Sequence, residues 1–250
     1  MYVVDIETQP QPDDYIRSIL PPYSHKSKPP GEFNPASVKF GQTKDPTKRA
    51  EKLAACQEKH AAAVAGFNDE LADGEREYYA TAIDRAALSA TTGKIAAIGV
   101  LDASSSRPAI LGQDGNEAKT IEWFFKIYAK AKQEERSIVG FNIFGFDLPF
   151  IAQRAMILNV DIPGDFIEKN RYWHRIFVDL ADIWTFGRRL QMPKLGELCA
   201  VFGMAGKSGS GADFHKLWNG DPSERQQAID YLKNDLDITV AVARRMGVVA

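Results

Sequence analysis

Alternating hydrophobic and polar residues predict a strand at the start of the chain, in the sequence MYVVDIET. Its first four residues are mostly β-branched or aromatic, a composition that favours a strand in a sheet core. Because side chains alternate along a strand, Asp5 and Glu7 should point to the same face as Val3. Two carboxylates on one core face repel each other and lose hydration, so packing alone does not explain them.

The same periodicities predict the rest of an α/β core. Further strands are expected in four short apolar runs, at 93–101, 107–111, 137–141 and 176–180. Apolar residues at helical spacing predict helices at 121–128 and 148–156. Ser223 and Gln226 have the spacing of a capping box and should start a long last helix after Pro222. We therefore expect one sheet flanked by helices.

Residues 9–46 interrupt this pattern with eight of the thirteen prolines, a density that argues against regular helix or central strand. The part from Ser24 to Lys52 carries seven cations against three anions. This surplus fits either a solvated loop or an arm that contacts phosphates. The segment is therefore expected to be a proline-rich, basic arm.

Residues 47–87 are rich in alanine and are predicted to be helical. Positions three or four apart form a seam, which consists of Leu53, Gln57, His60, Val64, Phe67 and Leu71. Its polar members favour a single helix packed back on the body over a dimeric coiled coil. The expected organisation is a domain of residues 1–8 and 88–250 with an insertion at 9–87.

Composition narrows the class of protein only slightly. A chain of 250 residues with 44% hydrophobic content suits one large domain or a domain with an insertion, and the net charge of −2 does not exclude nucleic acid. Cys56 and Cys199 lie far apart, so neither a disulfide framework nor a zinc site is expected. Apolar runs stay well below the roughly 18 residues of a membrane span, and Met1 leads into a strand rather than a signal peptide. We expect a cytoplasmic protein without a membrane segment.

Further acids occur at the start of one predicted helix and on one face of another. Asp147 ends the sequence FNIFGFD at a strand-to-helix junction, where it could simply cap the following helix. In the last helix, Tyr231 and Asp235 are four residues apart and share one face. Asp230 and Asp237 are turned away from that face and should be surface acids.

Four carboxylates that converge need a positive charge to neutralise them. Hard divalent ions such as Mg²⁺ prefer oxygen ligands and accept carboxylates together with water and phosphate. Two such ions roughly 3.5–4 Å apart can bind the attacking and leaving oxygens of a phosphodiester.

Three motifs stand in the order of the exonuclease motifs of the DEDD superfamily. These are Asp-Ile-Glu-Thr at 5–8, Asn-x-x-x-Phe-Asp-Leu-Pro-Phe at 142–150 and Tyr-x-x-x-Asp at 231–235. The second, in FNIFGFDLPFI, resembles the proofreading domains of family B DNA polymerases. Tyr231, with Asp230 where other members have histidine, is similar to the tyrosine subtype. The resemblance covers residues 1–8 and about 88–250, and the chain looks like the stand-alone bacterial or phage relatives, since no polymerase domain follows.

This resemblance implies a ribonuclease-H-like α/β fold with a central mixed sheet. It also implies a 3′–5′ exonuclease that uses two divalent ions, Mg²⁺ or Mn²⁺, and releases nucleoside 5′-monophosphates from 3′ ends of single-stranded DNA. The metal ligands would be Asp5, Glu7, Asp147 and Asp235, and Tyr231 would position the attacking water. These five residues are the expected catalytic set.

The expected contacts to the terminal nucleotides are Thr8, Asn142, Phe144 and Phe146. Both phenylalanines could also be ordinary core residues, whereas an aromatic ring exposed beside the site could stack on a base. DNA is favoured over RNA by the resemblance alone, so a 3′–5′ exoribonuclease stays open, as does a catalytically silent nucleic-acid-binding module. Replication or repair proteins are candidate partners.

Two other features invite a phosphate-binding interpretation. The sequence GMAGKS at 203–208 lacks the first glycine of a phosphate loop, because Val201 stands there. We expect a flexible loop, in which Lys207 could touch a nucleic-acid backbone. Arg188–Arg189 and Lys194 fit either surface charges or backbone contacts.

Overall fold

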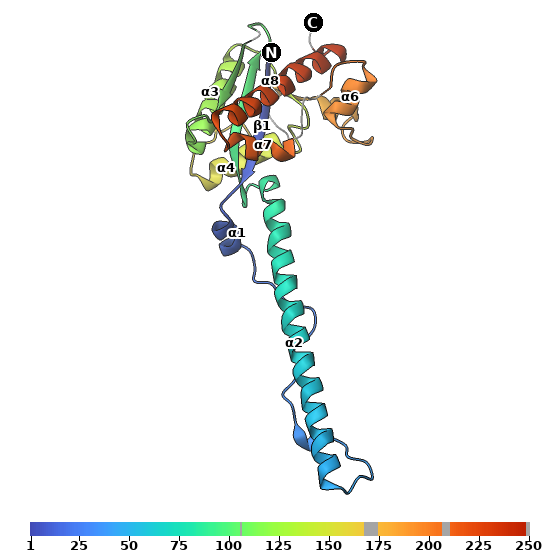
Figure 1. The fold of residues 1–250 in the computed structure, drawn as a ribbon. Helices are drawn as coiled ribbons and strands as arrows, with labels where there is room; N and C mark the ends of the chain where they lie inside the picture. The colour runs from blue at the N-terminus through green and yellow to red at the C-terminus, as the bar shows by residue number, and fades with distance from the viewer. Residues whose placement is uncertain (106, 168–174, 207–210, 249–250) are drawn as a thin grey trace. The chain divides into compact units, whose positions relative to one another are not determined.

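The computed structural model describes residues 1–105, 107–167, 175–206 and 211–248. The chain forms two compact units (Figure 1). Met1–Pro12 and Arg85–Ala250 make the first, called here the α/β unit, and Asp13–Asp84 make the second, called the insertion unit.

Among the described residues, five strands form one mixed sheet in the α/β unit, in the order β3-β2-β1-β4-β5. They are β1 (Tyr2–Pro10), β2 (Gly93–Asp102), β3 (Arg107–Leu111), β4 (Ile138–Gly140) and β5 (Phe177–Asp179). β1 pairs antiparallel with β2, and β2 with β3, whereas β4 lies parallel to both β1 and β5. The predicted strands are confirmed, and β1 continues two residues beyond Thr8, where the change of composition suggested that it would end.

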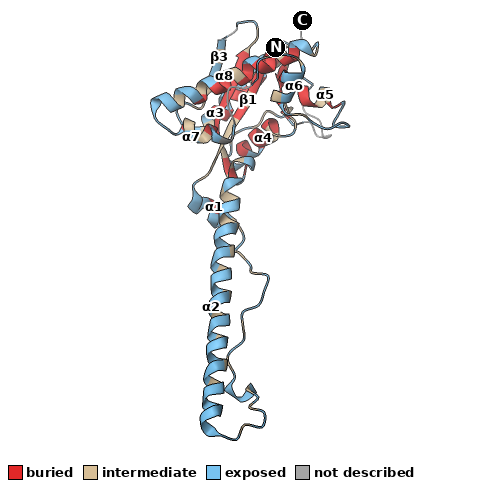
Figure 2. Cartoon of the chain, turned by 45° about the vertical axis from the view of Figure 1, so that its right-hand side comes forward, coloured by how far each residue is buried: buried red, intermediate tan, exposed pale blue. Residues whose placement is uncertain are grey.

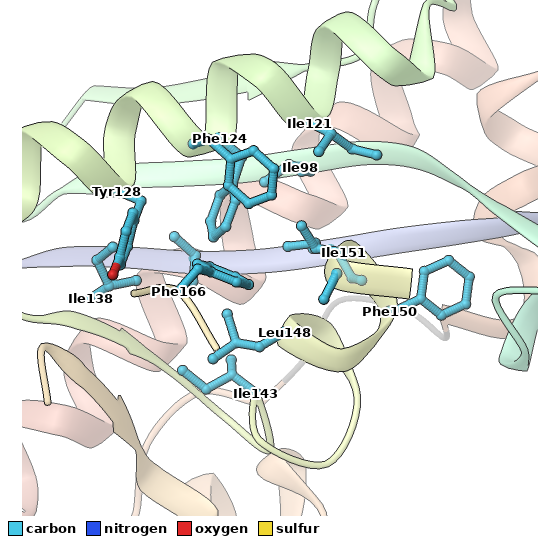
Figure 3. Packing of buried hydrophobic residues seen from close by; sticks show 14 of the residues in the cluster. Ile98, Ile121, Phe124, Tyr128, Ile138, Ile143, Leu148, Phe150, Ile151 and Phe166 are labelled. Carbon is cyan, nitrogen blue, oxygen red and sulfur yellow. The ribbon is translucent and has the colours of Figure 1, made fainter. Parts of the chain in front are cut away.

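Helices cover both faces of this sheet. Val4 and Ile6 of β1 pack on one face with α3 (Glu117–Gln133) and α4 (Asp147–Ile157), in a cluster rich in aromatic rings such as Phe124 (Figure 3). Val3 belongs to the cluster on the other face, with Leu236 of α8 (Pro222–Arg245) and residues of α6 (Leu195–Val201). The strand alternation therefore directs Asp5 and Glu7 towards the α8 side, as their spacing predicts.

The long last helix α8 starts with a different capping box from the one expected. Asp221 is the N-cap and accepts hydrogen bonds from the amides of Ser223 and Glu224 at 2.8 and 2.9 Å, while the Glu224 carboxylate accepts one from the Asp221 amide at 2.9 Å. The predicted pair of Ser223 and Gln226 is wrong. Pro222 is favourable at the first helical position, which makes the residue before it the cap.

Short helices complete the α/β unit. They are α5 (Leu180–Trp184), α7 (Phe214–Trp218) and the 3₁₀ turns η2 (Ala86–Leu88) and η3 (Gly211–Asp213). In the GMAGKS sequence, Lys207 and Ser208 lie outside the described residues.

The insertion unit contains α1 (Asp13–Ile19), η1 (Pro35–Ser37) and the 39-residue helix α2 (Pro46–Asp84). Helix α1 contradicts the expectation that the proline-rich segment has no regular helix. No proline occurs between Pro12 and Pro21, so the backbone donors of one short helix remain available. None of the residues of α2 is buried, as its pale blue and tan colours in Figure 2 show.

The predicted seam of α2 packs against the proline-rich segment of its own unit. His60 Nε2 lies 2.7 Å from the Gly31 carbonyl oxygen, and the rings of Phe67 and His25 are 5.1 Å apart. Further along, the Tyr78 hydroxyl donates to the carbonyl oxygen of Pro21 at 3.1 Å. The segment therefore runs antiparallel to the helix. Gln57, an expected seam member, is exposed instead.

Candidate active site

Three carboxylates converge where β1 passes α8. Oxygen atoms of Asp5, Glu7 and Asp235 all lie within 4.8 Å of one another. Asp5 and Glu7 come from one face of β1, and the pairing of β1 with β2 shifts register directly after Glu7. Asp235 comes from the buried face of α8 and is only 2% exposed. A strand and a helix thus supply the cluster that the two motifs predicted.

Asp147 joins this group from the start of α4. The N-cap of that helix is Phe146, which makes no side-chain capping bond, so the interpretation of Asp147 as a cap is wrong. Instead, its Oδ1 atom accepts a hydrogen bond from the Ile6 amide at 3.0 Å. β4 ends at Gly140, and beyond that point the carboxylate takes the place of a strand partner for β1. Asp147 is therefore fixed beside the β1 acids.

Burial and charge make the ionised form of Asp147 unfavourable. Loss of hydration raises the pKa of this carboxyl well above its ordinary value of 3.8, and the negative charge of Asp5 raises it further. The hydrogen bond from Ile6 acts in the opposite direction but is the weaker influence. The carboxylates of Asp147 and Asp5 therefore repel each other, and a bound cation would relieve this repulsion.

Tyr231 lies one turn before Asp235 on α8 and is 8% exposed. Burial raises the pKa of its phenol, and the charges of Asp235 and Glu7 add to the effect. A Cβ atom added at Gly211 would lie 3.5 Å from the Tyr231 Oη atom and 3.8 Å from Glu7 Oε2. The start of η3 therefore lies close to both side chains. The phenol remains a hydrogen-bond donor at neutral pH.

The surface acids of α8 contrast with this arrangement. Asp230 and Asp237 are exposed, which confirms the prediction from their helical positions. They provide matched controls for the buried members of the site.

An open cleft of about 790 Å³ lies in front of these groups. Asp5, Asp147 and Tyr231 line one part of it. Residues 192–197 and Gly211 also belong to its lining. Lys194, which the sequence left as either a surface charge or a backbone contact, lies in this lining. The local sequence pattern did not predict that the residues next to it would line the cleft.

The expected nucleotide contacts divide into two pairs. Asn142 and Phe146 line the cleft, and Asn142 adopts a left-handed backbone conformation with φ of 62°. Phe144 instead packs against the hydrophobic core, and the Thr8 hydroxyl donates to the Ala87 carbonyl oxygen at 2.7 Å. Neither Phe144 nor Thr8 belongs to the cleft lining.

Sequence reasoning missed Asp179, which holds the turn that carries Asn142. Asp179 is 1% exposed, and its carboxylate accepts hydrogen bonds from the amides of Asn142 at 2.8 Å and Phe144 at 3.0 Å. It also accepts from Ala181 at 2.9 Å and pairs with Arg188 at 3.1 Å. Arg188 is therefore engaged with a carboxylate at this turn. A lone acid at a strand end gives no sequence signal that distinguishes this role from a helix cap.

Comparisons with known proteins show which family the chain belongs to. Residues 87–248 match a family described as a predicted 3′–5′ exonuclease related to the exonuclease domain of PolB. The matched range contains Asp147, Tyr231 and Asp235 but begins after β1. No curated protein matches the chain.

A solved structure supports the fold independently. The family B DNA polymerase from the hyperthermophilic archaeon Pyrobaculum calidifontis matches with a TM-score of 0.53 and 21% identity, over 65% of this chain and 23% of the polymerase chain. The mixed sheet is that of a ribonuclease-H-like fold. Within the described ranges, every helix is too short or too polar to cross a membrane. The chain belongs to the family of predicted 3′–5′ exonucleases related to the exonuclease domain of PolB.

Proposed function

We propose that this protein is a metal-dependent exonuclease that hydrolyses the last phosphodiester bond at the 3′ end of single-stranded DNA. The observation that carries the proposal is the convergence of oxygen atoms of Asp5, Glu7 and Asp235 within 4.8 Å of one another, beside an open cleft lined by Asp5, Asp147 and Tyr231. Family membership supports the 3′–5′ polarity. The choice of single-stranded DNA follows from the resemblance to polymerase proofreading domains.

The donor set fits hard divalent ions. Carboxylate oxygens are the protein ligands that Mg²⁺ and Mn²⁺ prefer, and Asp5, Glu7, Asp147 and Asp235 would hold two of them. The raised pKa of Asp147 supports this assignment, because a buried acid next to another acid favours a cation nearby. When bound, two such ions stabilise the charge on the attacking and leaving oxygens of an in-line displacement.

The reaction consumes one water molecule. Water adds to the phosphorus of the terminal phosphodiester, the bond to the 3′ oxygen breaks, and the last nucleotide leaves with its 5′ phosphate. Since the pKa of Tyr231 is raised, its phenol keeps its proton and cannot serve as the general base at neutral pH. We assign its hydroxyl to orient the attacking water through a hydrogen bond. Phe214, whose ring lies 6.2 Å from the Tyr231 ring, and Gly211 restrict its position.

The cleft lining suggests how the strand end is held. Phe146 presents an aromatic ring that can stack on an unpaired base, which requires a single strand. The ring also contacts Phe150, 5.4 Å away between centroids, so its orientation is fixed by the core. Lys194 supplies a positive charge for a phosphate, and Asn142 supplies an amide in the same cleft.

Substitution of single carboxylates tests the site. Asp5→Asn and Asp147→Asn should each slow Mg²⁺- or Mn²⁺-dependent trimming of a 3′ end by about a thousandfold or more, because each removes a metal ligand. Asp237→Asn, a surface acid on α8, is the matched control and should trim at the wild-type rate. Labelled single-stranded DNA, duplex DNA and RNA are compared in one assay. Near-normal activity of both site variants would refute the assignment, and faster cleavage of RNA would replace the proposed substrate.

Tyr231→Phe separates positioning from metal binding. We expect single-turnover hydrolysis to slow by about 10²-fold, the scale of a lost positioned proton donor or acceptor. The Mn²⁺ concentration for half-maximal activity should stay the same. An unchanged single-turnover rate would remove the proposed role of the phenol.

A further inference from the structure

Helix α2 carries a second surface that its own unit leaves uncovered. The seam that faces residues 21–40 occupies one side of the helix. At about 100° per residue, nine other residues fall within roughly 60° of one another on a neighbouring side. They are Lys48, Lys52, Ala55, Lys59, Gly66, Glu70, Asp73, Glu77 and Asp84, and all are exposed. We call this surface the polar face of α2.

Charges on the polar face are sorted by sign along the helix. Its first half, up to Lys59, bears only lysines and alanine, and its second half, from Glu70, bears only acids. Gly66 lies midway between them. Lys59 and Asp73 are each seven residues from Gly66, and Lys48 and Asp84 are each eighteen residues from it. At about 1.5 Å per residue, these offsets are roughly 10 and 27 Å on either side.

We propose that the polar face of α2 binds a second copy of this chain, with the two helices antiparallel and a twofold axis at Gly66. In that arrangement Lys59 faces Asp73 of the other copy, Lys48 faces its Asp84, and the symmetry makes each pair twice. A parallel pair would instead place lysine against lysine and acid against acid. The sorted charges therefore select the antiparallel direction, and Gly66 at the axis sets the register.

The flank of the polar face is complementary in the same register. Glu58 lies eight residues before Gly66 and Arg76 ten residues after it, on the same side of the helix. Arg76 now pairs with Asp73 at 3.0 Å in an exposed contact that can be exchanged at little cost. The twofold axis brings Glu58 of one copy towards Arg76 of the other.

Gly66 is an independent sign of close approach. Glycine in the middle of an exposed helix costs about 1 kcal/mol relative to alanine. A Cβ atom added at Gly66 would meet nothing within 4 Å, so no neighbour within the chain requires a glycine there. At a twofold axis the residue faces its own symmetry mate, and the missing side chain lets the two backbones approach.

Nucleic acid is the alternative partner for such a surface. The lysines alone would suit a phosphate backbone, but the same face continues into four acids that would repel it. The second copy uses both halves, which is why we favour it.

Charge reversal in the full-length protein tests the pairing. Wild type should dimerise in sedimentation equilibrium at micromolar concentration, more weakly as salt is raised. Lys48→Glu with Lys59→Glu, and separately Asp73→Lys with Asp84→Lys, should each weaken dimerisation by at least about tenfold, since four contacts become repulsive. The protein with all four changes should recover wild-type association. Circular dichroism checks that α2 stays helical in each variant.

Several outcomes would overturn the proposal. One is a wild-type protein that stays monomeric, and another is a fourfold variant as weak as its parents. A third is a monomer in which only the lysine changes reduce binding to a DNA oligomer, which would assign the face to nucleic acid.

Disulfide trapping tests the register directly. In a Cys56→Ser background, Gly66→Cys places a thiol at the proposed axis, where the two copies should cross-link on mild oxidation. Ala54→Cys, also exposed but about 120° around the helix, is the matched control and should cross-link far less. Cys199 is buried and does not interfere. Equal cross-linking of the two variants would refute the axis at Gly66.

Discussion

The α/β unit buries some of its carboxylates, whereas helix α2 of the insertion unit leaves all of its carboxylates exposed or only partly covered. In the α/β unit, Asp147, Asp179 and Asp235 are at most 4% exposed. In the insertion unit, helix α2 carries many acids and buries none of its residues. Burying a charge is costly, whereas an exposed charge costs almost nothing. These three acids are therefore held where folding alone would not favour them, while those of α2 lie where folding tolerates them.

The two units also differ in what fixes their side chains. β1 is paired on both sides and covered on both faces, so the side chains that it carries have little freedom. Helix α2 is held to its proline-rich segment by ring contacts and a few hydrogen bonds. Substitutions should thus have large effects in the first unit and local effects in the second.

The largest change in the free energy of unfolding is expected for substitution of Asp179. Asp179→Ala removes the acceptor for several backbone amides and leaves the Arg188 guanidinium without its buried partner. We expect a loss of roughly 3–5 kcal/mol in the free energy of unfolding, because several backbone amides lose their acceptor at about 1–3 kcal/mol each. Denaturant unfolding measures it. Asp182→Ala, which removes a more exposed partner of Arg188 at 3.5 Å, is the control and should change stability by less than about 0.5 kcal/mol. Similar midpoints for the two variants would contradict the proposed role of Asp179.

In the absence of metal, Asp147→Asn should raise the stability of the folded protein, by less than Asp179→Ala lowers it. The folded state raises the pKa of Asp147 above its unfolded value of 3.8, so between these two pKa values the folded protein keeps a proton that the unfolded chain releases. Wild-type stability should therefore fall as pH rises through that interval. Asparagine cannot ionise and can still accept the Ile6 hydrogen bond, so the variant should melt higher at neutral pH, by roughly 2–4 °C for each 1 kcal/mol gained.

Thermal unfolding in EDTA from acid to neutral pH measures this difference. The two proteins should converge as pH falls below 3.8, where Asp147 becomes protonated in both states. Mn²⁺ should raise the Tm of wild type more than that of the variant. A difference that does not depend on pH would mean that burial of the charge is not its cause.

The smallest effect on the α/β unit should come from Phe67→Ala in α2. This change removes the ring contact with His25, worth about 0.5–1.5 kcal/mol. Hydrogen exchange should accelerate around residues 21–33 and in the facing turns of α2. Gln57→Ala, an exposed neighbour on the same helix, should leave exchange unchanged. A change in the unfolding midpoint of the α/β unit would show that the two units are energetically linked.

Local sequence patterns predict the parts of this protein whose cause is local. Alternation in MYVVDIET predicts the facing of Asp5 and Glu7, and apolar runs predict the strands. The gathering of Asp147 and Asp235 beside them was predicted from the order of three motifs, since no local rule brings distant elements together. Helix α1 was missed because overall proline density concealed a short stretch without proline.

Other misses have a long-range cause. Asp179 caps α5 and at the same time binds a turn 35 and 37 residues earlier in the chain, and only the second role is peculiar to this site. The wall of the cleft at residues 192–197 reaches the carboxylates through tertiary packing alone. The capping box of α8 lies two residues before the predicted one, because proline at the first helical position makes Asp221 the cap.

The pairing of Pro10 with Gly93 at the end of the β1–β2 ladder has a consequence for how this protein can change. Gln11 also donates to the Thr92 carbonyl oxygen at 2.9 Å, so the chain leaves and re-enters the sheet at one point. In topological terms, everything between them is the loop of a β-hairpin. Doubling the length of such a loop costs only about 0.6 kcal/mol. Segments of very different size can therefore be exchanged at this point while β1 keeps its register and the acids keep their places.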